Sequence, residues 1–377
     1  MVRAPCQSGC PASVDIPGFV SLVGEKRYAE ALRHHRERNP FAAACARICF
    51  HPCEHMCRRS TVDSSVAIRS VKRFMVDQEL VIQIPEVLEN ARNAARKIAI
   101  VGAGPAGLSC AYFLARLGYK PKIFEAAPRP GGMMVQTIPE YRLPREMLAR
   151  EIRMIEGLGV DIECGKVLGK DFTLQQLKDQ GYEAVFLAAG APEGVKIGLA
   201  GEESQGVIEA INFLREYNIR GSVKVGKHVA IIGGGNAAID AARTAVRLGA
   251  ETVSVFYRRT REQMPAYEEE IEEAEAEGII LKLLTAPEEI IVENGHVAGV
   301  RCRKMTLGSF DKTGRRRPVA GKDGDFMVPC DQLIAAIGQR VDVPALTGNL
   351  KPAVAANGYI LANPLPPLTA NQRSNNA

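Results

Sequence analysis

The sequence predicts an α/β fold in which two similar parallel-sheet units follow a helical region rich in cysteine. Lys97–Val101 and His228–Ile232 are almost wholly apolar runs, typical of buried parallel strands, and each leads into a glycine-rich turn. Six of the ten cysteines lie within the first 57 residues. With 377 residues, 46% of them apolar, the chain is long enough for two or three domains that each bury a core.

Composition and charge exclude several classes of protein. The 35 glycines and 6% aromatic residues favour a loop-rich α/β protein over a fibrous or disordered one. The formal net charge of +5 arises mainly in residues 1–75, where twelve Lys or Arg residues face six Asp or Glu, without the interleaved aromatic residues of a nucleic-acid-binding surface. No apolar run of about 18 residues and no charged-then-apolar leader is present. We therefore expect a soluble, cytoplasmic protein with neither nucleic acid nor membrane as a partner.

Three segments show helical spacing. Ser21–His35 and residues 61–82 alternate apolar and charged residues at helical intervals. Residues 267–277 contain seven glutamates around Ile271 and Ala274, which predicts a solvated helix face with a thin apolar stripe and no function of its own.

The clustered cysteines indicate a metal or cluster site. On one helix, four of them would share a face because they recur every four residues: Cys45, Cys49, Cys53 and Cys57. Cys10 precedes Pro11, as cluster-ligating cysteines often precede a proline. In a reducing compartment, such clustering favours ligation over disulfides, and soft thiolates suit iron–sulfur clusters or zinc. Zinc remains the alternative, since His51 and His55 lie among the thiols.

The first glycine-rich turn has the features of a dinucleotide site. A strand, a G-x-G-x-x-G turn, a helix and a second strand follow one another, and the turn contains Gly102, Gly104, Pro105, Ala106 and Gly107. Gly102 permits the tight turn, Gly104 lets a pyrophosphate approach the helix, and Gly107 lets the helix pack on the strand. The second strand ends at Glu125, 18 residues after Gly107, near the spacing at which a carboxylate receives the ribose hydroxyls.

The second glycine-rich turn predicts a different nucleotide. It has the form G-x-G-x-x-A and contains Gly233, Gly235, Asn236 and Ala237. The strand after it ends not in an acid but in Arg258 and Arg259, whose guanidinium groups would pair with a 2′-phosphate that a carboxylate would repel. This favours NADP(H) over NAD(H); the alternative is a solvated arginine pair at a strand end.

Two such turns in one chain predict two dinucleotides, most simply a flavin that faces a nicotinamide. The fold class is therefore α/β, with two Rossmann-like dinucleotide-binding domains preceded by an α-helical iron–sulfur domain. Hydride transfer then belongs to the cofactors, and no catalytic side chain is expected. Disulfide chemistry is disfavoured because Cys110 and Cys164 are isolated and residues 131–134 contain no cysteine.

Taken together, these motifs resemble the family of the small subunit of NADPH-dependent glutamate synthase, whose relatives include the N-terminal part of dihydropyrimidine dehydrogenase. The resemblance is carried by Cys6–Pro17, Cys49–Arg59, Gly102–Gly107, Gly131–Gly132 with Ile138–Pro144, Gly233–Asp240, Tyr257–Ala266 and Ala335–Gln339. It implies FAD, NADPH and a [4Fe–4S] cluster that feed electrons to a larger catalytic subunit or a ferredoxin-like acceptor. It also adds Gly131, Gly132, Arg142 and Gly338 to the expected cofactor-binding residues.

The same resemblance implies a division of the chain. The expected domains are 1–95 for a helical [4Fe–4S] domain, 96–222 for the first part of an FAD domain, 223–330 for an NADPH domain, 331–362 for an incomplete return to the FAD domain, and 363–377 for a disordered tail. The expected ligands of one cluster are Cys10, Cys49, Cys53 and Cys57, with Cys6 and Cys45 as substitutes.

The chain departs from the family at both ends. Relatives carry a further Cys-x-x-Cys ahead of the position of Cys6, which would support a second cluster. At the other end, the family continues into a Gly-Asp segment and a helix that close over the flavin, whereas this sequence ends in LPPLTANQRSNNA. We therefore expect one cluster and weakly held FAD. The alternative function is a non-catalytic zinc- and nucleotide-binding module, or a truncated remnant of such a subunit.

Overall fold

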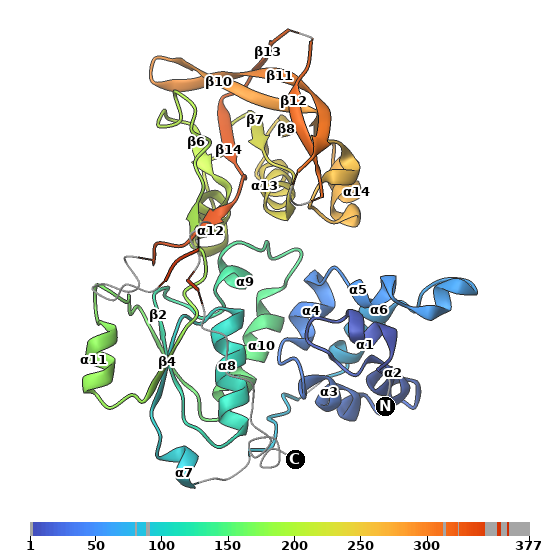
Figure 1. Ribbon diagram of the computed structural model, residues 1–377, viewed down its shortest axis with the longest axis vertical. Coiled ribbons are helices and arrows are strands. Elements are labelled where there is room, and N and C mark those ends of the chain that lie inside the picture. Colours follow the sequence, from blue (N-terminus) through green and yellow to red (C-terminus); the bar gives the residue numbers. More distant parts are fainter. Residues whose placement is uncertain are drawn as a thin grey trace.

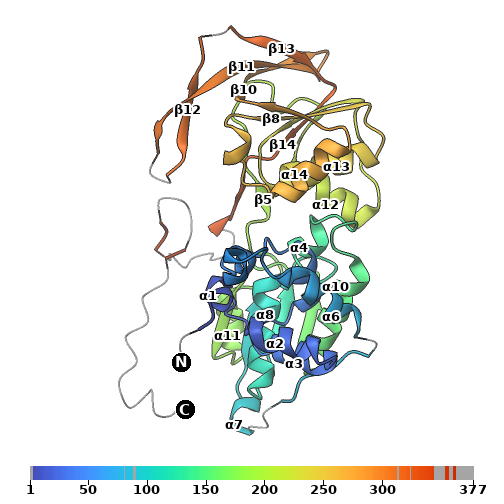
Figure 2. The same ribbon diagram turned by 90° about the vertical axis from the view of Figure 1, so that its right-hand side faces the viewer.

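Three regions follow one another in the computed structural model, which describes residues 3–79, 81–87, 91–311, 314–322, 324–343, 353–355 and 360–361. A helical region comes first, then a unit built on one parallel sheet, then a unit built on a second parallel sheet (Figure 1). The second-sheet unit lies at one end of the long axis, and the other two regions pack together at the opposite end (Figure 2). The expected tail 363–377 lies outside the described residues.

The amino-terminal region is built from short helices around its own core. They are α1 (Pro5–Gly9), α2 (Ile16–Gly24), α3 (Tyr28–Arg36), α4 (Ala42–Ile48), α5 (Pro52–His55), the 3-10 helix η1 (Arg58–Thr61) and α6 (Ile68–Asp77). Phe19, Leu32 and Met75 lie in the core, each only 1% exposed. Since these apolar side chains come from α2, α3 and α6, the region has a hydrophobic core independent of the two sheets.

The structure shortens two predicted helices of this region. The pattern over Ser21–His35 is divided between α2 and α3, because Lys26 adopts a left-handed conformation with φ 61° between them. Within residues 61–82, only α6 is an α-helix. The segment before it contains Asp63, whose carboxylate accepts a hydrogen bond from the Ser64 N–H, a local contact that competes with a helical backbone.

The first parallel sheet has the strand order β3-β2-β1-β4. Its strands are β1 (Ile98–Val101), β2 (Lys122–Glu125), β3 (Asp161–Cys164) and β4 (Ala184–Leu187), and its helices are α7 (Ala91–Ala94), α8 (Pro105–Arg116), α9 (Met133–Gln136), α10 (Arg145–Glu156) and α11 (Leu174–Asp179). Ile100 and Leu108 belong to the core between the sheet, α8 and α10, whereas Val101 packs with Leu177 of α11 on the other face.

The second parallel sheet has the strand order β6-β14-β7-β8-β9. Its strands are β6 (Val207–Glu209), β7 (His228–Ile232), β8 (Thr252–Tyr257), β9 (Ile280–Leu283) and β14 (Gln332–Ala335), with α12 (Ala210–Arg220), α13 (Asn236–Arg247), the 3-10 helix η2 (Arg261–Gln263) and α14 (Glu268–Ala276). Both sheets place a glycine-rich turn after a central strand, at the start of α8 and of α13. In sheets of this kind, ligands bind at the carboxyl ends of the strands.

A small antiparallel sheet packs on the second unit. It contains β10 (Thr285–Glu293), β11 (His296–Phe310), β12 (Arg316–Ala320) and β13 (Phe326–Pro329), and β10, β12 and β13 all pair with β11. Val300 and Cys302 of β11 form one core with Phe256 of β8. A separate ladder joins β15 (Gln339–Arg340) to β5 (Glu193–Gly194). The antiparallel sheet therefore covers one face of the second parallel sheet.

Two expected domain boundaries need correction. The strand β14, expected to return to the first unit, pairs with β6 and β7 in the second sheet. The strand β6 and helix α12, expected in the first unit, also belong to the second, where Phe213 and Leu214 of α12 pack in its core. The apolar run Leu333–Gly338 resembles any buried parallel strand, so its sequence does not specify its sheet.

Candidate nucleotide and iron–sulfur sites

The first glycine-rich turn leaves room for a pyrophosphate. Gly102 has φ 105°, and a Cβ there would lie 2.4 Å from the Ala188 carbonyl oxygen, so the turn requires glycine. A Cβ on Gly104, in contrast, would approach nothing closer than the Gly132 Cα at 3.8 Å. Gly104 precedes the first turn of α8, which contains Pro105 and Ala106 and whose N–H groups have no helical partners. The space at Gly104 therefore fits an anion at a helix amino terminus.

Glu125 supports this turn from the end of β2. It is only 6% exposed, and its two carboxylate oxygens accept hydrogen bonds from the backbone N–H groups of Ala103 (2.5 Å) and Ala127 (2.7 Å). The other lone pair on each oxygen can still accept from the ribose hydroxyls expected here. The Gly131 N–H donates to the Ala103 carbonyl at 2.8 Å, which brings the predicted residues Gly131 and Gly132 to the same turn.

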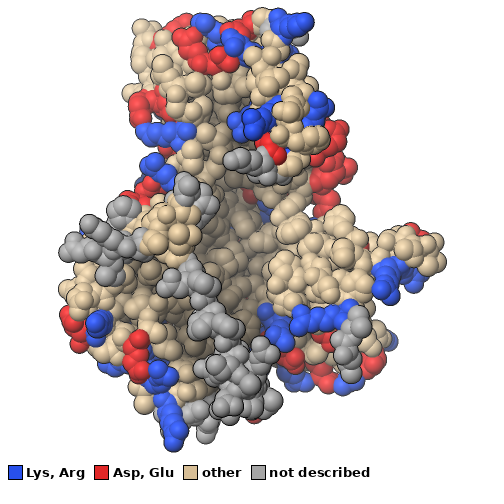
Figure 3. All heavy atoms as spheres, viewed as in Figure 1, with Lys and Arg blue, Asp and Glu red and all other residues tan. Residues whose placement is uncertain are grey.

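The second glycine-rich turn borders a cavity of about 880 Å³. All the residues expected to bind NADPH line it, together with Gly338: Gly233, Gly235, Asn236, Ala237, Arg258 and Arg259. A Cβ on Gly235 would meet nothing within 4 Å, so this helix amino terminus is open as well. Figure 3 shows the hollow between the second-sheet unit and the rest of the molecule, with walls that are mostly neither acidic nor basic.

The two predicted arginines differ in their surroundings. Arg258 is exposed, whereas Arg259 is 5% exposed. Nε of Arg259 donates to the Arg316 carbonyl oxygen at 2.9 Å, and Nη2 donates to Oδ2 of Asp311 at 3.2 Å. Sequence reasoning missed Arg315, which follows β11 and also lines the cavity. Arg315 lies far along the chain from both glycine motifs, so no motif in the sequence indicated that it would reach the nucleotide cavity.

The four cysteines do not lie on one helix, the arrangement in which their four-residue spacing would give them a common face. Helix α4 ends at Ile48, Cys49 is extended, and α5 begins only at Pro52. His51 between them has φ 45°, a left-handed conformation that an α-helix cannot contain. Cys45, Cys49, Cys53 and Cys57 therefore lie on a helix–loop–helix path rather than on one helical face.

The charges that act on each thiol show which cysteines lie near one another. Burial raises the pKa of Cys53 to about 11, and the nearby charges of Cys49 and Cys10 add to the increase. Burial also raises the pKa of Cys6, where the neighbouring charge is that of Cys57. Cys10, Cys49 and Cys53 thus form a first group, which contains three of the four expected ligands, and a second group pairs the fourth, Cys57, with the substitute Cys6.

Cys45, the other substitute ligand, lies near Cys49 of the first group. Burial raises the pKa of Cys45, to which the nearby charge of Cys49 contributes. All ten cysteines of the chain are free thiols.

A buried lysine lies beside the first group. Lys72 of α6 is 8% exposed and makes no hydrogen bond or ion pair within the described part of the chain, yet its positive charge acts on Cys45 and Cys53. In the described residues, no three His, Cys, Asp or Glu side chains converge tightly enough to hold one metal ion. A four-iron cluster is larger than an ion and binds each thiolate at a different iron.

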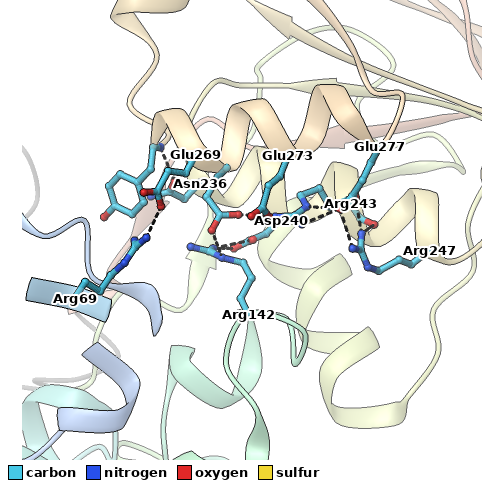
Figure 4. A network of polar contacts seen from close by, with 11 residues as sticks. Arg69, Arg142, Asn236, Asp240, Arg243, Arg247, Glu269, Glu273 and Glu277 are labelled. Atoms are coloured by element: carbon cyan, nitrogen blue, oxygen red, sulfur yellow. Dashed lines mark hydrogen bonds and ion pairs between the residues drawn. The ribbon is translucent and has the colours of Figure 1, made fainter. Parts of the chain in front are cut away.

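Arg142, expected to bind a cofactor, anchors a network of ion pairs (Figure 4). Its Nη1 lies 2.8 Å from both carboxylate oxygens of Asp240 on α13, and its Nε lies 2.8 Å from Glu270 on α14. Burial raises the pKa of Asp240 to about 6, against the lowering effect of Arg142. Arg142 also borders a second cavity, of about 260 Å³, together with Asn236.

The glutamates of α14, expected to form only a solvated face, extend this network. Arg243 pairs with Glu270, Glu273 and Glu277, all between 2.6 and 2.7 Å. At the other end, Glu269 pairs with Arg69 of α6 at 2.5 Å (Figure 4). Helix α14 therefore touches both other regions, a role that depends on tertiary contacts and left no signal in the sequence.

An aromatic contact joins the cysteine loop to the 880 Å³ cavity at the second glycine-rich turn. Phe50, next to Cys49, stacks on Tyr267 with ring centroids 5.5 Å apart and planes inclined by 20°. The Tyr267 N–H donates to Oδ1 of Asn236 at 3.1 Å, and Asn236 lines the cavity. Only these few residues thus separate the expected cluster ligand Cys49 from the wall of the nucleotide site.

Within the described ranges, no helix combines the length and the apolar character needed to cross a bilayer.

Comparisons with known proteins agree with this organisation. A family model for pyridine nucleotide-disulphide oxidoreductases matches residues 96–365, and a model for dihydropyrimidine dehydrogenase domain II, 4Fe-4S cluster, matches residues 2–84. The glutamate synthase [NADPH] small chain of Escherichia coli is 33% identical over 349 residues, which cover 89% of this chain and 74% of that protein. The resemblance found in the motifs is thereby confirmed.

Two other relatives are more similar in sequence. The NADP(+)-dependent formate dehydrogenase subunit beta of Moorella thermoacetica is 42% identical over 97% of this chain and 54% of its own length. The NADPH-Fe(3+) oxidoreductase subunit beta of Geobacter sulfurreducens is 43% identical over 92% of this chain and 52% of its own length. The chain thus spans about half the length of these two relatives.

Solved structures support the fold. FprA of Mycobacterium tuberculosis, solved in complex with NADPH, has a TM-score of 0.57 at 20% identity and covers 66% of this chain and 72% of its own. The predicted cofactor set of FAD, NADPH and a 4Fe-4S cluster is that of the two matching family models. The chain therefore belongs to the pyridine nucleotide-disulphide oxidoreductase family and carries, ahead of that domain, a 4Fe-4S domain of the dihydropyrimidine dehydrogenase type.

Proposed function

We propose that this chain is an electron-input subunit, which takes a hydride from NADPH and passes single electrons to a larger partner. The bound FAD would accept the hydride and release electrons one at a time, and the cluster would carry them onward. The first glycine-rich turn would bind the FAD pyrophosphate at α8, and the second would bind NADPH at α13. The protein's own contribution is to position these groups, and no side chain is required as an acid or base.

One observation supports this function over a simple nucleotide-binding module. The loop from Cys49 to Cys53 packs on the second nucleotide cavity through the contacts of Phe50 with Tyr267 and of Tyr267 with Asn236. A metal site that only stabilised the helical region would have no need of this location. Thiolates beside a nucleotide cavity suit a relay in which electrons leave the redox site over a short distance.

The partner is a larger catalytic oxidoreductase subunit or a ferredoxin-like acceptor. Relatives are named as the beta subunit of a formate dehydrogenase, the beta subunit of an Fe(3+) oxidoreductase and the small chain of glutamate synthase. These names share NADP(+) or NADPH and differ in the second substrate. We infer that this chain supplies the NADPH half-reaction and that its partner determines the acceptor, so a glutamate synthase-like activity is one of several it could serve.

The test is spectroscopic and uses protein purified without oxygen. Flavin absorption bands with a broad shoulder near 400 nm, both bleached by NADPH, are the expected result. NADPH should also reduce an artificial one-electron acceptor such as ferricyanide. A colourless protein that contains zinc would instead support the non-catalytic module and contradict the proposal.

A further inference from the structure

The turn between β11 and β12 brings a third arginine to the second nucleotide cavity. Arg315 lies in this turn and lines the same cavity as Arg258 and Arg259. Arg258 and Arg315 are both exposed, whereas Arg259 is only 5% exposed. Two exposed arginines therefore border one cavity from two different elements, the end of β8 and the β11–β12 turn.

Asp311 ties this turn to the end of β8. Its Oδ2 accepts a hydrogen bond from Nη2 of Arg259 at 3.2 Å, and its Oδ1 accepts from the backbone N–H of Arg315, also at 3.2 Å. Nε of Arg259 donates to the Arg316 carbonyl oxygen at 2.9 Å. The backbone of Asp311 closes the turn, because its N–H donates to the Arg315 carbonyl at 2.7 Å. A buried guanidinium thus fixes the turn that places Arg315.

We propose that Arg258 and Arg315 together bind the 2′-phosphate of NADPH, and that Arg259 is a positioning residue that holds the β11–β12 turn. This inference rests on the proposed function, because it specifies how the same cavity distinguishes NADPH from NADH. The edge of the Arg259 guanidinium formed by Nε and Nη2 is already bound to Arg316 and Asp311. Arg259 therefore affects phosphate binding indirectly, because it holds the turn that positions Arg315.

The charge and geometry of the phosphate support two arginines. A phosphate monoester carries between one and two negative charges at neutral pH and has three acceptor oxygens. A single guanidinium can satisfy two of these oxygens in a bidentate pair, so a second guanidinium adds a charge-assisted bond. NADH has a hydroxyl at this position and would gain little from either arginine.

The experiment measures dissociation constants of NADPH and NADH for the cofactor-loaded protein by titration calorimetry. The measured quantity is the NADH-to-NADPH ratio of the two constants. Arg315→Ala should lower this ratio roughly tenfold, the usual size for loss of one charge-assisted hydrogen bond. Arg317→Ala is the matched control, because it removes the same charge from an exposed residue of β12 that does not line the cavity. The control should leave the ratio unchanged.

Further variants test the positioning role of Arg259. Arg259→Ala should lower the ratio about as much as Arg315→Ala, and the double variant should be no worse than either single one, since both changes remove the same contact. Arg259→Lys keeps the charge but lacks the two-donor edge, so it should not restore the ratio. Binding of 2′-AMP, which carries the phosphate without a nicotinamide, should weaken in each variant that lowers the ratio.

Distinct outcomes would overturn distinct claims. Equal ratios for Arg315→Ala and Arg317→Ala would show that Arg315 contributes only to the general surface charge and does not bind the 2′-phosphate. Additive losses in the double variant, or rescue by Arg259→Lys, would make Arg259 a direct phosphate ligand and refute its positioning role. If the unmodified protein bound neither nucleotide, the proposed function itself would fail, and this is seen before any variant is made.

Discussion

At the scale of single residues, Lys72 is the clearest sign of an anionic group among the cysteines. It is buried without a partner in the described part of the chain, and its charge acts on two thiols. A positive charge on a largely buried side chain stabilises negative charge that lies close to it. A cluster held by thiolates gains negative charge on reduction, so Lys72 should favour the reduced state.

Lys72→Met should therefore make the reduction potential of the cluster more negative. At an effective dielectric constant of about 20, a unit charge roughly 8 to 16 Å away contributes about 1 to 2 kcal/mol, on the order of 50–100 mV for one electron. A redox titration followed by electron paramagnetic resonance measures this. Lys72→Arg should keep the potential, and Arg73→Met, at the adjacent exposed position of α6, should change it little because solvent screens its charge. Equal shifts for the two Met variants would contradict this role.

Cys53 should be a ligand whose loss removes the cluster. It is the buried member of the group with Cys10 and Cys49. Cys53→Ala should lower both iron and acid-labile sulfide, measured chemically in protein purified without oxygen. Cys164→Ala, on β3 and apart from the cysteine cluster, should retain both. Unchanged iron and sulfide in Cys53→Ala would remove Cys53 from the ligand set.

At the scale of elements, Glu151 of α10 caps helix α4 across the boundary between two regions. Its carboxylate oxygens accept hydrogen bonds from the N–H groups of Ala43 (2.5 Å) and Ala44 (3.1 Å), and the residue is 1% exposed. Burial raises its pKa from 4.5 to about 7, despite these hydrogen bonds and the charge of Arg36. The helical region is thus fixed to the first unit by a carboxyl group that burial keeps partly protonated near neutral pH.

This cap should make stability depend on pH. Because the pKa is higher in the folded state, the folded protein binds the proton more tightly, so the contribution to stability is complete below pH 4.5 and is lost as the pH rises through about 7. The loss would be about 3 kcal/mol. Glu151→Gln cannot ionise, so its unfolding free energy in urea should change less between pH 5 and pH 8 than that of the unmodified protein. Parallel pH dependences would show that Glu151 does not titrate in this window.

The elements that sequence predicts well are those whose signals are local. Both glycine-rich turns, their strands and their helices lie where the motifs placed them, because φ above zero at Gly102 and close packing at Gly107 restrict the residue type directly. The four-residue cysteine spacing does not correspond to one helical face, because the left-handed residue His51 interrupts the helix between Cys49 and Cys53. Arg315 and the pairs of α14 were not foreseen, since both depend on contacts between segments that are distant in sequence.

At the scale of the whole molecule, the three regions meet at α14 and the start of α13. Glu269 reaches Arg69 of the helical region (Figure 4), and Glu270 pairs with Arg142 of the first unit. Tyr267, just before α14, contacts both Phe50 and Asn236. The second unit is therefore held against its neighbours by these ion pairs, by the aromatic stack, and by hydrogen bonds from Arg215 and Asn218 of α12 to Gln136 of α9.

Arg142→Met tests whether this junction stabilises the assembled molecule. The substitution leaves the carboxylate of Asp240, only 5% exposed, without its partner, and breaking a buried pair from one side costs about 3–5 kcal/mol. The pKa of Asp240 is already about 6 beside Arg142 and should rise further without it. At pH 5 the carboxyl group would be protonated and would need no partner, so the destabilisation should be large at pH 8 and small at pH 5.

Scanning calorimetry at the two pH values measures this difference. The double variant Arg142→Met/Asp240→Asn removes the stranded charge as well, and should recover part of the stability lost by Arg142→Met at pH 8 while changing little at pH 5. Equal losses at both pH values, with no recovery in the double variant, would mean that Arg142 stabilises the junction by packing its side chain. In that case, the ion pair would not be what holds the second unit in place.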